Sequence, residues 1–163
     1  MKTFFLLSFE LLLSSIIFTY AQTNYIQFVD PFIGTGKNGH TFPGATLPFG
    51  MVQLSPDTDI EGWDWCSGYH YSDSSIMGFS HTHLSGTGIG DYGDVLFMPA
   101  TGEIKIEPGS KSNPDEGYRS RFSHKSETAE PGYYSVMLDD YNIFVELTAT
   151  SRAGFHRYNF PGD

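Results

Sequence analysis

The sequence predicts an all-β fold, and more specifically an antiparallel β-sandwich. Glycine, proline, asparagine and aspartate interrupt the chain at short intervals, which is typical of strands joined by turns. Beyond residue 21, no stretch keeps apolar residues at helical spacing over three turns, so little helix is expected. The apolar segments between the turns predict about seven to nine short strands.

Two apolar runs in the first hundred residues are predicted to be buried, central strands. The first covers residues 49–54 between Pro48 and Pro56, and the second covers residues 95–98 before Pro99. A continuous apolar run between turn residues is typical of a strand that is covered on both faces.

The second half of the chain is predicted to form ordinary strand-and-turn scaffold. Ile104 and Ile106 alternate with charged residues, which would place both isoleucines on one face of a half-exposed strand. Residues 134–138 and 143–147 flank the polar residues 139–142, a connection suited to a hairpin. Residues 153–160 are expected to supply another strand.

Composition excludes several classes of protein. The 163 residues carry 19 acidic and 9 basic side chains, a formal net charge of -10, and the basic residues form no cluster. Nucleic acid is therefore not an expected partner, because binding to phosphates needs clustered cations. Hydrophobic residues at 39% against 17% charged residues favour a folded domain over disorder. Cys66 is the only cysteine, so no internal disulfide forms.

The first 21 residues are predicted to be a secretory signal peptide. Lys2 precedes an apolar run over residues 4–20, which ends in a plausible cleavage site at Ala21. Glu10 and the marginal length argue against a retained membrane anchor. We therefore expect an exported protein, periplasmic or secreted, without membrane attachment after cleavage and with its domain over residues 22–163.

A cluster of aromatic and polar residues covers positions 62–71. In an extended segment, Trp63 and Trp65 would lie on one face, with Asp64 and Cys66 on the other. Aromatic rings beside carboxylates suit sugars, whose C–H faces stack on rings while their hydroxyls hydrogen-bond to carboxylates. Two tryptophans around an aspartate are too polar for a good core, which favours a binding site over core filling. Cys66 is expected to be a small buried residue and not a nucleophile.

Two histidines, His81 and His83, would point to the same side of a strand, a spacing that zinc hydrolases use. Nothing in the spacing of the other candidate ligands selects a third one. Hydrogen-bonding histidines in a polar pocket and surface histidines are alternatives that the sequence leaves open.

The glycine-rich loop at residues 30–44 contains Gly-Thr-Gly-Lys but does not match a phosphate-binding loop. Pro31 stands where that motif needs a glycine, and Asn38 stands where it needs serine or threonine. A loop that brings His40 to a ligand and a purely structural turn are equally consistent with these residues.

Aspartates are frequent in the same half of the chain. They are Asp57, Asp59, Asp64, Asp73, Asp91 and Asp94. Glycoside hydrolysis commonly uses two carboxylates. Aspartates in glycine-rich loops are more often turn formers, so each one is individually a weak catalytic candidate.

Long motifs in the chain resemble the N-terminal domain of glycoside hydrolase family 92, the calcium-dependent α-mannosidases. They cover residues 29–36, 39–57, 63–73 and 78–88, and residues 146–156 fit the same family. The resemblance extends over nearly all of residues 22–163.

The resemblance implies an exo-acting enzyme that releases mannose from α-mannoside glycans with inversion, with the α-1,2 type expected. It also implies that a β-sandwich packs on a C-terminal (α/α)-barrel. The catalytic acid, the catalytic base and the Ca²⁺ ligands belong to that barrel, so this chain is expected to contain no catalytic residue and no metal ligand. The chain stops before the barrel, so we expect a partial domain that is inactive alone.

The resemblance also assigns residues that wall the mannose pocket. The substrate-binding candidates are Trp63, Asp64, Trp65, His83, Gly86, Thr87 and Gly88. Zinc at His81 and His83 becomes less favoured, because the family metal is calcium, which prefers oxygen ligands. A stand-alone carbohydrate-binding module and a zinc hydrolase are the alternative functions.

Overall fold

The computed structural model describes residues 24–86, 90 and 92–162, and in this part of the chain the structure is built from short antiparallel strands. The strands are β1 (Ala45–Thr46), β2 (Gln53–Asp57), β3 (Ser75–Ile76), β4 (Gly78–Ser80), β5 (Ser120–Arg121), β6 (Thr128–Glu130), β7 (Tyr133–Leu138), β8 (Ile143–Ala149) and β9 (Gly154–Asn159). The described residues also contain three short 3₁₀ helices, η2 (Tyr25–Phe28), η3 (Trp63–Trp65) and η4 (Pro114–Glu116).

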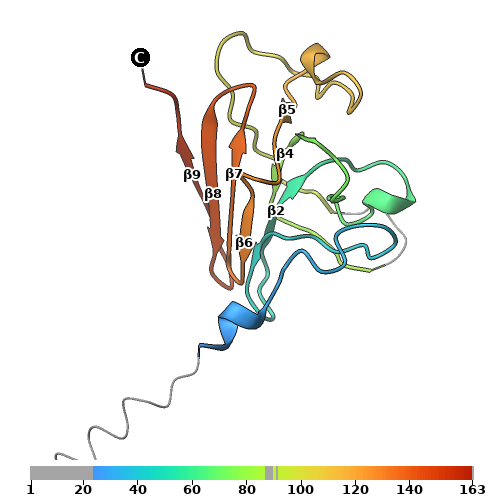
Figure 1. The fold of residues 1–163 in the computed structure, drawn as a ribbon, viewed down its shortest axis with the longest axis vertical. Helices are drawn as coiled ribbons and strands as arrows, with labels where there is room; N and C mark the ends of the chain where they lie inside the picture. The colour runs from blue at the N-terminus through green and yellow to red at the C-terminus, as the bar shows by residue number, and fades with distance from the viewer. Residues whose placement is uncertain (1–23, 87–89, 91, 163) are drawn as a thin grey trace, which may run out of the picture.

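The strands form three sheets, in the orders β1-β2-β4, β3-β5 and β6-β7-β8-β9. The four-stranded sheet stands beside the strands of the three-stranded sheet (Figure 1). β1 and β2 both lie against β8. The predicted all-β fold with antiparallel layers is confirmed.

The hydrophobic core fills the space between these layers. Along β8 buried residues alternate with more exposed ones, so Ile143, Val145 and Leu147 point inward. They pack with Leu54 of β2 and Phe79 of β4, all in one cluster of buried side chains. Stability therefore comes from packing between sheets, as expected for a chain whose one cysteine is free and buried.

The predicted hairpin at residues 134–147 is present as β7 and β8. Their register runs from Tyr133 opposite Thr148 to Leu138 opposite Ile143. Asn142 ends the connection with a φ of 52°, a left-handed conformation that asparagine tolerates. The strand expected at residues 153–160 is β9, which pairs with β8.

The central strand predicted at residues 49–54 is wrong over most of its length. The Gly50 amide donates to the Leu47 carbonyl at 3.0 Å, which makes this run the turn between β1 and β2. Phe49 has a φ of 60° and is fully exposed. Strand β2 begins only at Gln53 and includes Pro56, which lies beyond the stretch of β2 that pairs with β1. Proline is tolerated where one side of a strand is unpaired.

The central strand predicted at residues 95–98 is also wrong. The backbone of this segment pairs with β4 through a single bridge between Phe97 and Phe79, with two hydrogen bonds of 2.9 and 3.0 Å. Val95 and Phe97 are exposed. The apolar residues therefore form an irregular edge and not a buried centre.

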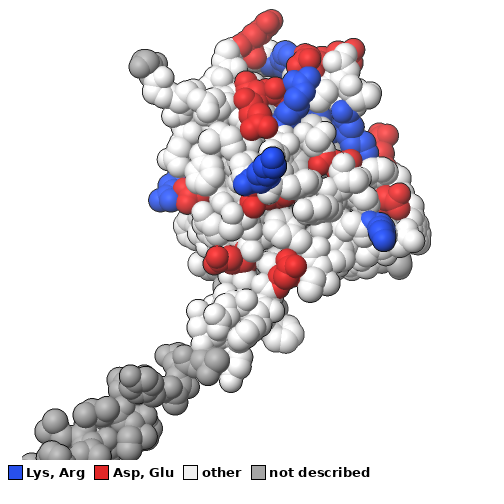
Figure 2. Space-filling model, in the orientation of Figure 1, with Lys and Arg blue, Asp and Glu red and all other residues white. Residues whose placement is uncertain are grey.

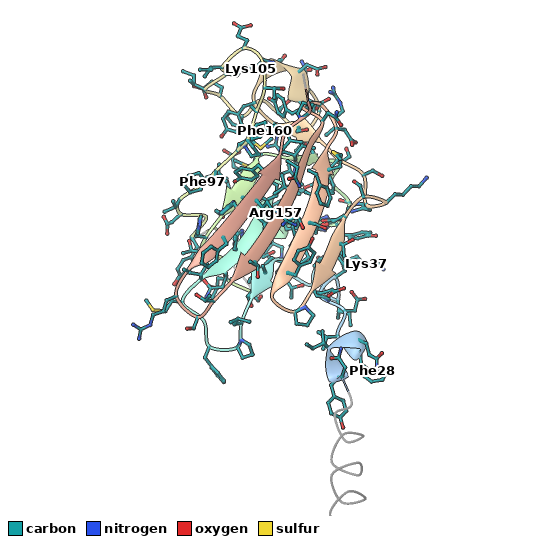
Figure 3. The ribbon with its side chains drawn as sticks, turned by 90° about the vertical axis from the view of Figure 1, so that its left-hand side faces the viewer. Phe28, Lys37, Phe97, Lys105, Arg157 and Phe160 are labelled. Carbon is teal, nitrogen blue, oxygen red and sulfur yellow. The ribbon has the colours of Figure 1, made fainter. Side chains whose placement is uncertain are left out.

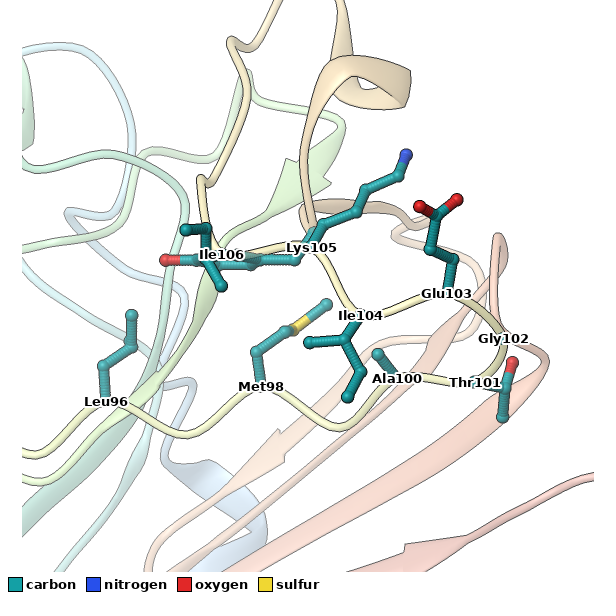
Figure 4. Close-up of a pocket in the computed structure, with 10 residues that line it drawn as sticks. Leu96, Met98, Ala100, Thr101, Gly102, Glu103, Ile104, Lys105 and Ile106 are labelled. Atoms are coloured by element: carbon teal, nitrogen blue, oxygen red, sulfur yellow. The ribbon is translucent and has the colours of Figure 1, made fainter.

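The strand predicted around Ile104 and Ile106 is absent among the described residues, and both side chains are exposed, at 89% and 82%. They line an open cavity of about 480 Å³ together with Leu96 and Met98 (Figure 4). Alternation of apolar and charged residues alone does not produce a strand, because the backbone N–H and C=O groups of a strand also need partners on a neighbouring strand.

Charged side chains of both signs are interspersed on the face in Figure 2, which fits the absence of a basic cluster in the sequence. No helix in the described part of the chain is long and apolar enough to cross a membrane.

Candidate functional site

The two tryptophans lie on the 3₁₀ helix η3 and not on the extended strand predicted from their alternation. Gly62 precedes this helix with a φ of 93°, a conformation that favours glycine. Because a 3₁₀ helix has three residues per turn, side chains two positions apart point in different directions. The prediction that Trp63 and Trp65 share one face is therefore wrong.

Trp63 is the open aromatic side chain of this helix. It is 56% exposed, and its ring meets the His40 ring at a centroid distance of 5.3 Å in an edge-to-face arrangement. Asp64 lies half-buried in the same turn. Trp63 and Asp64 therefore supply an accessible ring and a partly exposed carboxylate at successive positions of the same turn.

Trp65 is built into the protein. Its indole Nε1–H donates to the Asp73 carboxylate at 2.6 Å, and the Lys111 ammonium lies 3.1 Å from the centroid of its ring. Lys111 also pairs with Asp59 at 3.0 Å. These contacts use the polar atom and one face of Trp65, which therefore holds the loop in place.

His40 is buried behind Trp63 and has an unusual polar environment. Both of its ring nitrogens are without a hydrogen-bond partner in the described part of the chain, although only 4% of the residue is exposed. Buried polar groups are normally paired. The His40 carbonyl accepts the Gly86 amide at 2.8 Å, which brings the start of the predicted glycine turn beside Trp63. Thr87 and Gly88 lie outside the described residues.

His83 forms a buried pair with Asp57. Its Nε2 lies 2.8 Å from the carboxylate of Asp57, and its Nδ1 lies 2.7 Å from the carbonyl of Gln53. The second carboxylate oxygen of Asp57 accepts the Ser80 amide at 2.9 Å. Burial alone would lower the pKa of His83, but the Asp57 charge and these hydrogen bonds together raise it above its ordinary value.

Gly68 allows the tryptophan loop to approach this pair closely. A Cβ atom at this position would lie 2.5 Å from an oxygen of Asp57 and 2.9 Å from the His83 ring, and the φ of 79° also favours glycine. The space between Gly68, His83, Trp65 and Cys66 is a cavity of about 80 Å³. This is below the roughly 300 to 1,000 Å³ of typical ligand pockets, so this cavity alone is too small to hold a sugar.

A second buried group connects the loop to the four-stranded sheet. The Glu127 carboxylate accepts hydrogen bonds from the hydroxyls of Tyr69, at 3.0 Å, and Tyr134, at 2.6 Å. Nδ1 of His124 lies 2.6 Å from the same carboxylate. Tyr69 follows the tryptophans in sequence and Tyr134 belongs to β7, so Glu127 fixes the distance between the loop and the sheet.

The structure separates the two histidines that could have formed a zinc pair. Nδ1 of His81 lies 2.9 Å from the Val95 carbonyl, and Nε2 faces His156, whereas both nitrogens of His83 face Asp57 and Gln53. Among the described residues, no group of three or more histidine, cysteine, aspartate or glutamate side chains could hold a metal ion. His83 fits the alternative of a hydrogen-bonding histidine.

Most of the candidate aspartates bind to other parts of the protein. Asp57 contacts His83, Asp59 contacts Lys111, Asp73 contacts Trp65, and Asp94 contacts Thr82. Asp91 lies outside the described residues. These four carboxylates hold loops together.

Comparison with known proteins identifies the family of this chain. The model of the glycosyl hydrolase family 92 N-terminal domain matches residues 28–163. The chain belongs to glycosyl hydrolase family 92. The resemblance found in the motifs is thereby confirmed.

Several relatives of this family 92 chain are known. An uncharacterized secreted glycosidase of Arthroderma benhamiae is 32% identical over 165 residues, which cover 96% of this chain and 20% of the relative. A family 92 α-mannosidase of Bacteroides thetaiotaomicron, solved in complex with mannoimidazole, is 52% identical with a TM-score of 0.83, over 85% of this chain and 18% of its own. A family 92 inverting mannosidase of the same organism is 32% identical with a TM-score of 0.70, over 86% of this chain and 19% of its own. The family 92 chain described here thus spans about a fifth of the length of these relatives.

Sequence reasoning missed two residues of the site. The sequence presents Asp57 only as one of several candidate acids, because no local pattern connects it to His83, 26 positions away. No sequence pattern points to Glu127 as a residue of the site, since its partner Tyr69 lies 58 positions earlier. Both contacts depend on the packing of segments that are distant in sequence.

Proposed function

We propose that this family 92 chain forms part of the sugar-binding wall of an exported exo-α-mannosidase. The enzyme releases terminal mannose from α-mannoside glycans with inversion and is of the α-1,2 type. The catalytic acid and base lie outside this chain, in a C-terminal (α/α)-barrel that packs against the sandwich. Residues 1–21 direct export, and residues 22–163 belong to the N-terminal domain.

The observation that carries this proposal is the exposed ring of Trp63. Its neighbour Trp65 is covered by Lys111 and bonded to Asp73, so Trp63 is the tryptophan available to a sugar. An aromatic plane suits the C–H face of a pyranose, and the Asp64 carboxylate beside it accepts hydrogen bonds from hydroxyls. Trp63 and Asp64 therefore contact the mannoside, and Gly86 adds a further contact beside them. Thr87 and Gly88, which lie outside the described residues, remain predicted substrate-binding residues.

His83 and Trp65 support the wall from behind. The ring nitrogens of His83 are both engaged with protein oxygens, so its contribution is to hold Asp57 and Gly68 under the loop. The contribution of Trp65 is to connect the loop to Asp73.

The calcium ion of the proposed enzyme does not fit the described residues. Calcium takes six to eight oxygen ligands, and no cluster of three or more suitable side chains is present in the described part of the chain. Its ligands are therefore proposed to lie outside this chain, and the roles of Trp63 and Asp64 do not depend on it.

Isothermal titration calorimetry with methyl α-mannoside tests the role of Trp63. We expect weak binding, roughly millimolar, because the described residues form only part of a pocket. Trp63→Ala should abolish the heat of binding, because it removes the stacking surface. Phe160→Ala removes an equally exposed aromatic side chain elsewhere and should leave binding unchanged. Equal effects of the two substitutions would contradict the proposal.

A stand-alone carbohydrate-binding module is the alternative, since an exposed Trp63 would also suit it. Roughly micromolar affinity of the 163-residue chain for mannosides would favour the module, because it would require a complete site. Hydrolysis of an α-mannoside by this chain with calcium would contradict the placement of the catalytic carboxylates outside it.

A further inference from the structure

Two histidines from opposite layers of the sandwich, His81 and His156, face each other. His81 directly follows β4 of the three-stranded sheet, and His156 lies in β9 at the edge of the four-stranded sheet. Their Nε2 atoms are 3.2 Å apart. Figure 3 views the outer face of the four-stranded sheet, where Arg157 lies, with Phe97 beside the edge of the sheet. His156 precedes Arg157 in β9 and therefore points to the opposite, inner face.

The geometry of the two rings suits a shared ligand. Two imidazole nitrogens bound to one tetrahedral zinc ion lie about 3.3 Å apart, given zinc–nitrogen distances of roughly 2.0 to 2.1 Å. The ring centroids of His81 and His156 are 4.9 Å apart with an angle of 39° between the planes. The rings therefore meet at an angle and not head-on.

The opposite nitrogen of each ring is fixed by a second partner. Nδ1 of His81 lies 2.9 Å from the Val95 carbonyl, so it carries the proton and leaves Nε2 with a lone pair. Nδ1 of His156 lies 2.7 Å from the Tyr158 hydroxyl. Histidines that bind metals are typically oriented in this way through their other nitrogen.

The surroundings hold the pair in place and leave it accessible. The Phe97 ring contacts both imidazoles at centroid distances of 5.5 and 5.4 Å. Both histidines are only half-buried, so an ion in solution can reach them.

We propose that His81 and His156 form a two-histidine site for a late first-row divalent transition ion such as Zn²⁺, which connects the two sheets. The ion binds Nε2 of both rings, and water molecules complete its coordination. In the metal-free pair, Nε2–H of His156 donates to Nε2 of His81. When the ion binds, it takes the place of this proton at Nε2 of His156. The His156 ring then carries its proton on Nδ1, which donates to the Tyr158 oxygen, so no proton is released overall.

This site is different from a zinc site on His81 and His83. It also differs from a calcium site, because imidazole nitrogen suits transition ions, whereas calcium takes oxygen ligands. It does not depend on the proposed mannosidase function, since Trp63 and His40 play no part in it.

Thermal unfolding of the full chain with added ZnCl₂ tests the site. The melting temperature should rise with zinc concentration, because an ion that joins the sheets binds only the folded state. His81→Asn and His156→Asn should each abolish this shift, whereas His70→Asn, which removes a histidine bonded to Ser72, should retain it. Tyr158→Phe should weaken zinc binding about 10-fold or more, through loss of the partner of Nδ1.

A second measurement keeps the proposal testable if a variant fails to fold. Electron paramagnetic resonance of Cu²⁺ added to the unmodified chain should show two imidazole nitrogens bound to one ion. No saturable binding of Zn²⁺ or Cu²⁺, a copper spectrum with a single imidazole nitrogen, or a thermal shift that survives in folded His81→Asn and His156→Asn chains would overturn the proposal.

Discussion

The buried His83 imidazole favours its charged form, because both of its nitrogens face oxygen acceptors. A neutral imidazole has one donor and one acceptor nitrogen, so it could satisfy only one of the two partners, Asp57 and Gln53. Desolvation opposes the charge, and the Asp57 charge together with the hydrogen bonds to Asp57 and Gln53 outweighs it, so the pKa of His83 is raised. The result is an ion pair directly beneath the loop that carries Trp63.

This ion pair predicts how stability depends on pH. The pKa of His83 is raised above its ordinary value of 6.5, so the stabilisation is complete below about pH 6.5 and is lost as pH rises through the raised value. Urea unfolding of the wild type at a series of pH values should show this decline, and in Asp57→Asn the decline should be much smaller. Asp57→Ala should cost about 3 to 5 kcal/mol, because it leaves a buried charge unpaired. Parallel pH profiles of wild type and Asp57→Asn would refute the ion pair.

Single residues were only partly predictable. The sequence placed His83, Gly86 and Trp63 among the substrate-binding candidates, and the structure brings both Gly86 and Trp63 into contact with His40. The sequence does not distinguish Trp63 from Trp65. The difference depends on Lys111, 46 positions beyond Trp65, which covers the Trp65 ring.

At the level of elements, the tryptophan loop depends on the sheet beside it. The carboxylate of Glu127 connects Tyr69 of the loop to Tyr134 of β7 and is itself fully buried. On the outer side, the Tyr71 ring stacks on His124 at 4.1 Å, and His124 contacts the same carboxylate. The position of the loop is thus set by a network of hydrogen bonds and not by its own 3₁₀ helix.

Substitution of Glu127 tests this dependence. Glu127→Gln should lower the free energy of unfolding by about 2 to 3 kcal/mol, because charge-assisted hydrogen bonds become weaker and one amide group cannot accept from all partners. The matched control is Glu130→Gln in β6, where the side chain is exposed and the change should stay within about 0.5 kcal/mol. Chemical denaturation measures both, and equal effects would show that the buried network is not important for stability.

Strands were predictable where both pattern and partner are local. The β7–β8 hairpin follows from two apolar segments and a polar turn that are adjacent in sequence. Residues 49–54 and 95–98 are equally apolar, but they form a turn and an irregular edge. Apolar composition does not distinguish a buried strand from an apolar loop, since the difference lies in which distant segment covers it.

For the molecule as a whole, the described residues form a layered β domain with many apolar side chains left in solvent. Phe49, Met51, Ile104 and Ile106 are all more than 70% exposed. Such exposure is typical of a surface that meets another part of a larger protein. It agrees with the proposal that this domain packs against a barrel, since the chain spans about a fifth of its relatives.

The central claim is that Trp63, and not Trp65, contacts a mannoside. The chain has only 2 tryptophans, so an NMR spectrum of the ¹⁵N-labelled protein contains two indole N–H signals that substitution can assign. On addition of methyl α-mannoside, the Trp63 signal should move progressively, whereas the Trp65 signal, held by Asp73, should stay in place. Movement of the Trp65 signal alone, or of neither signal at saturating sugar, would contradict the account.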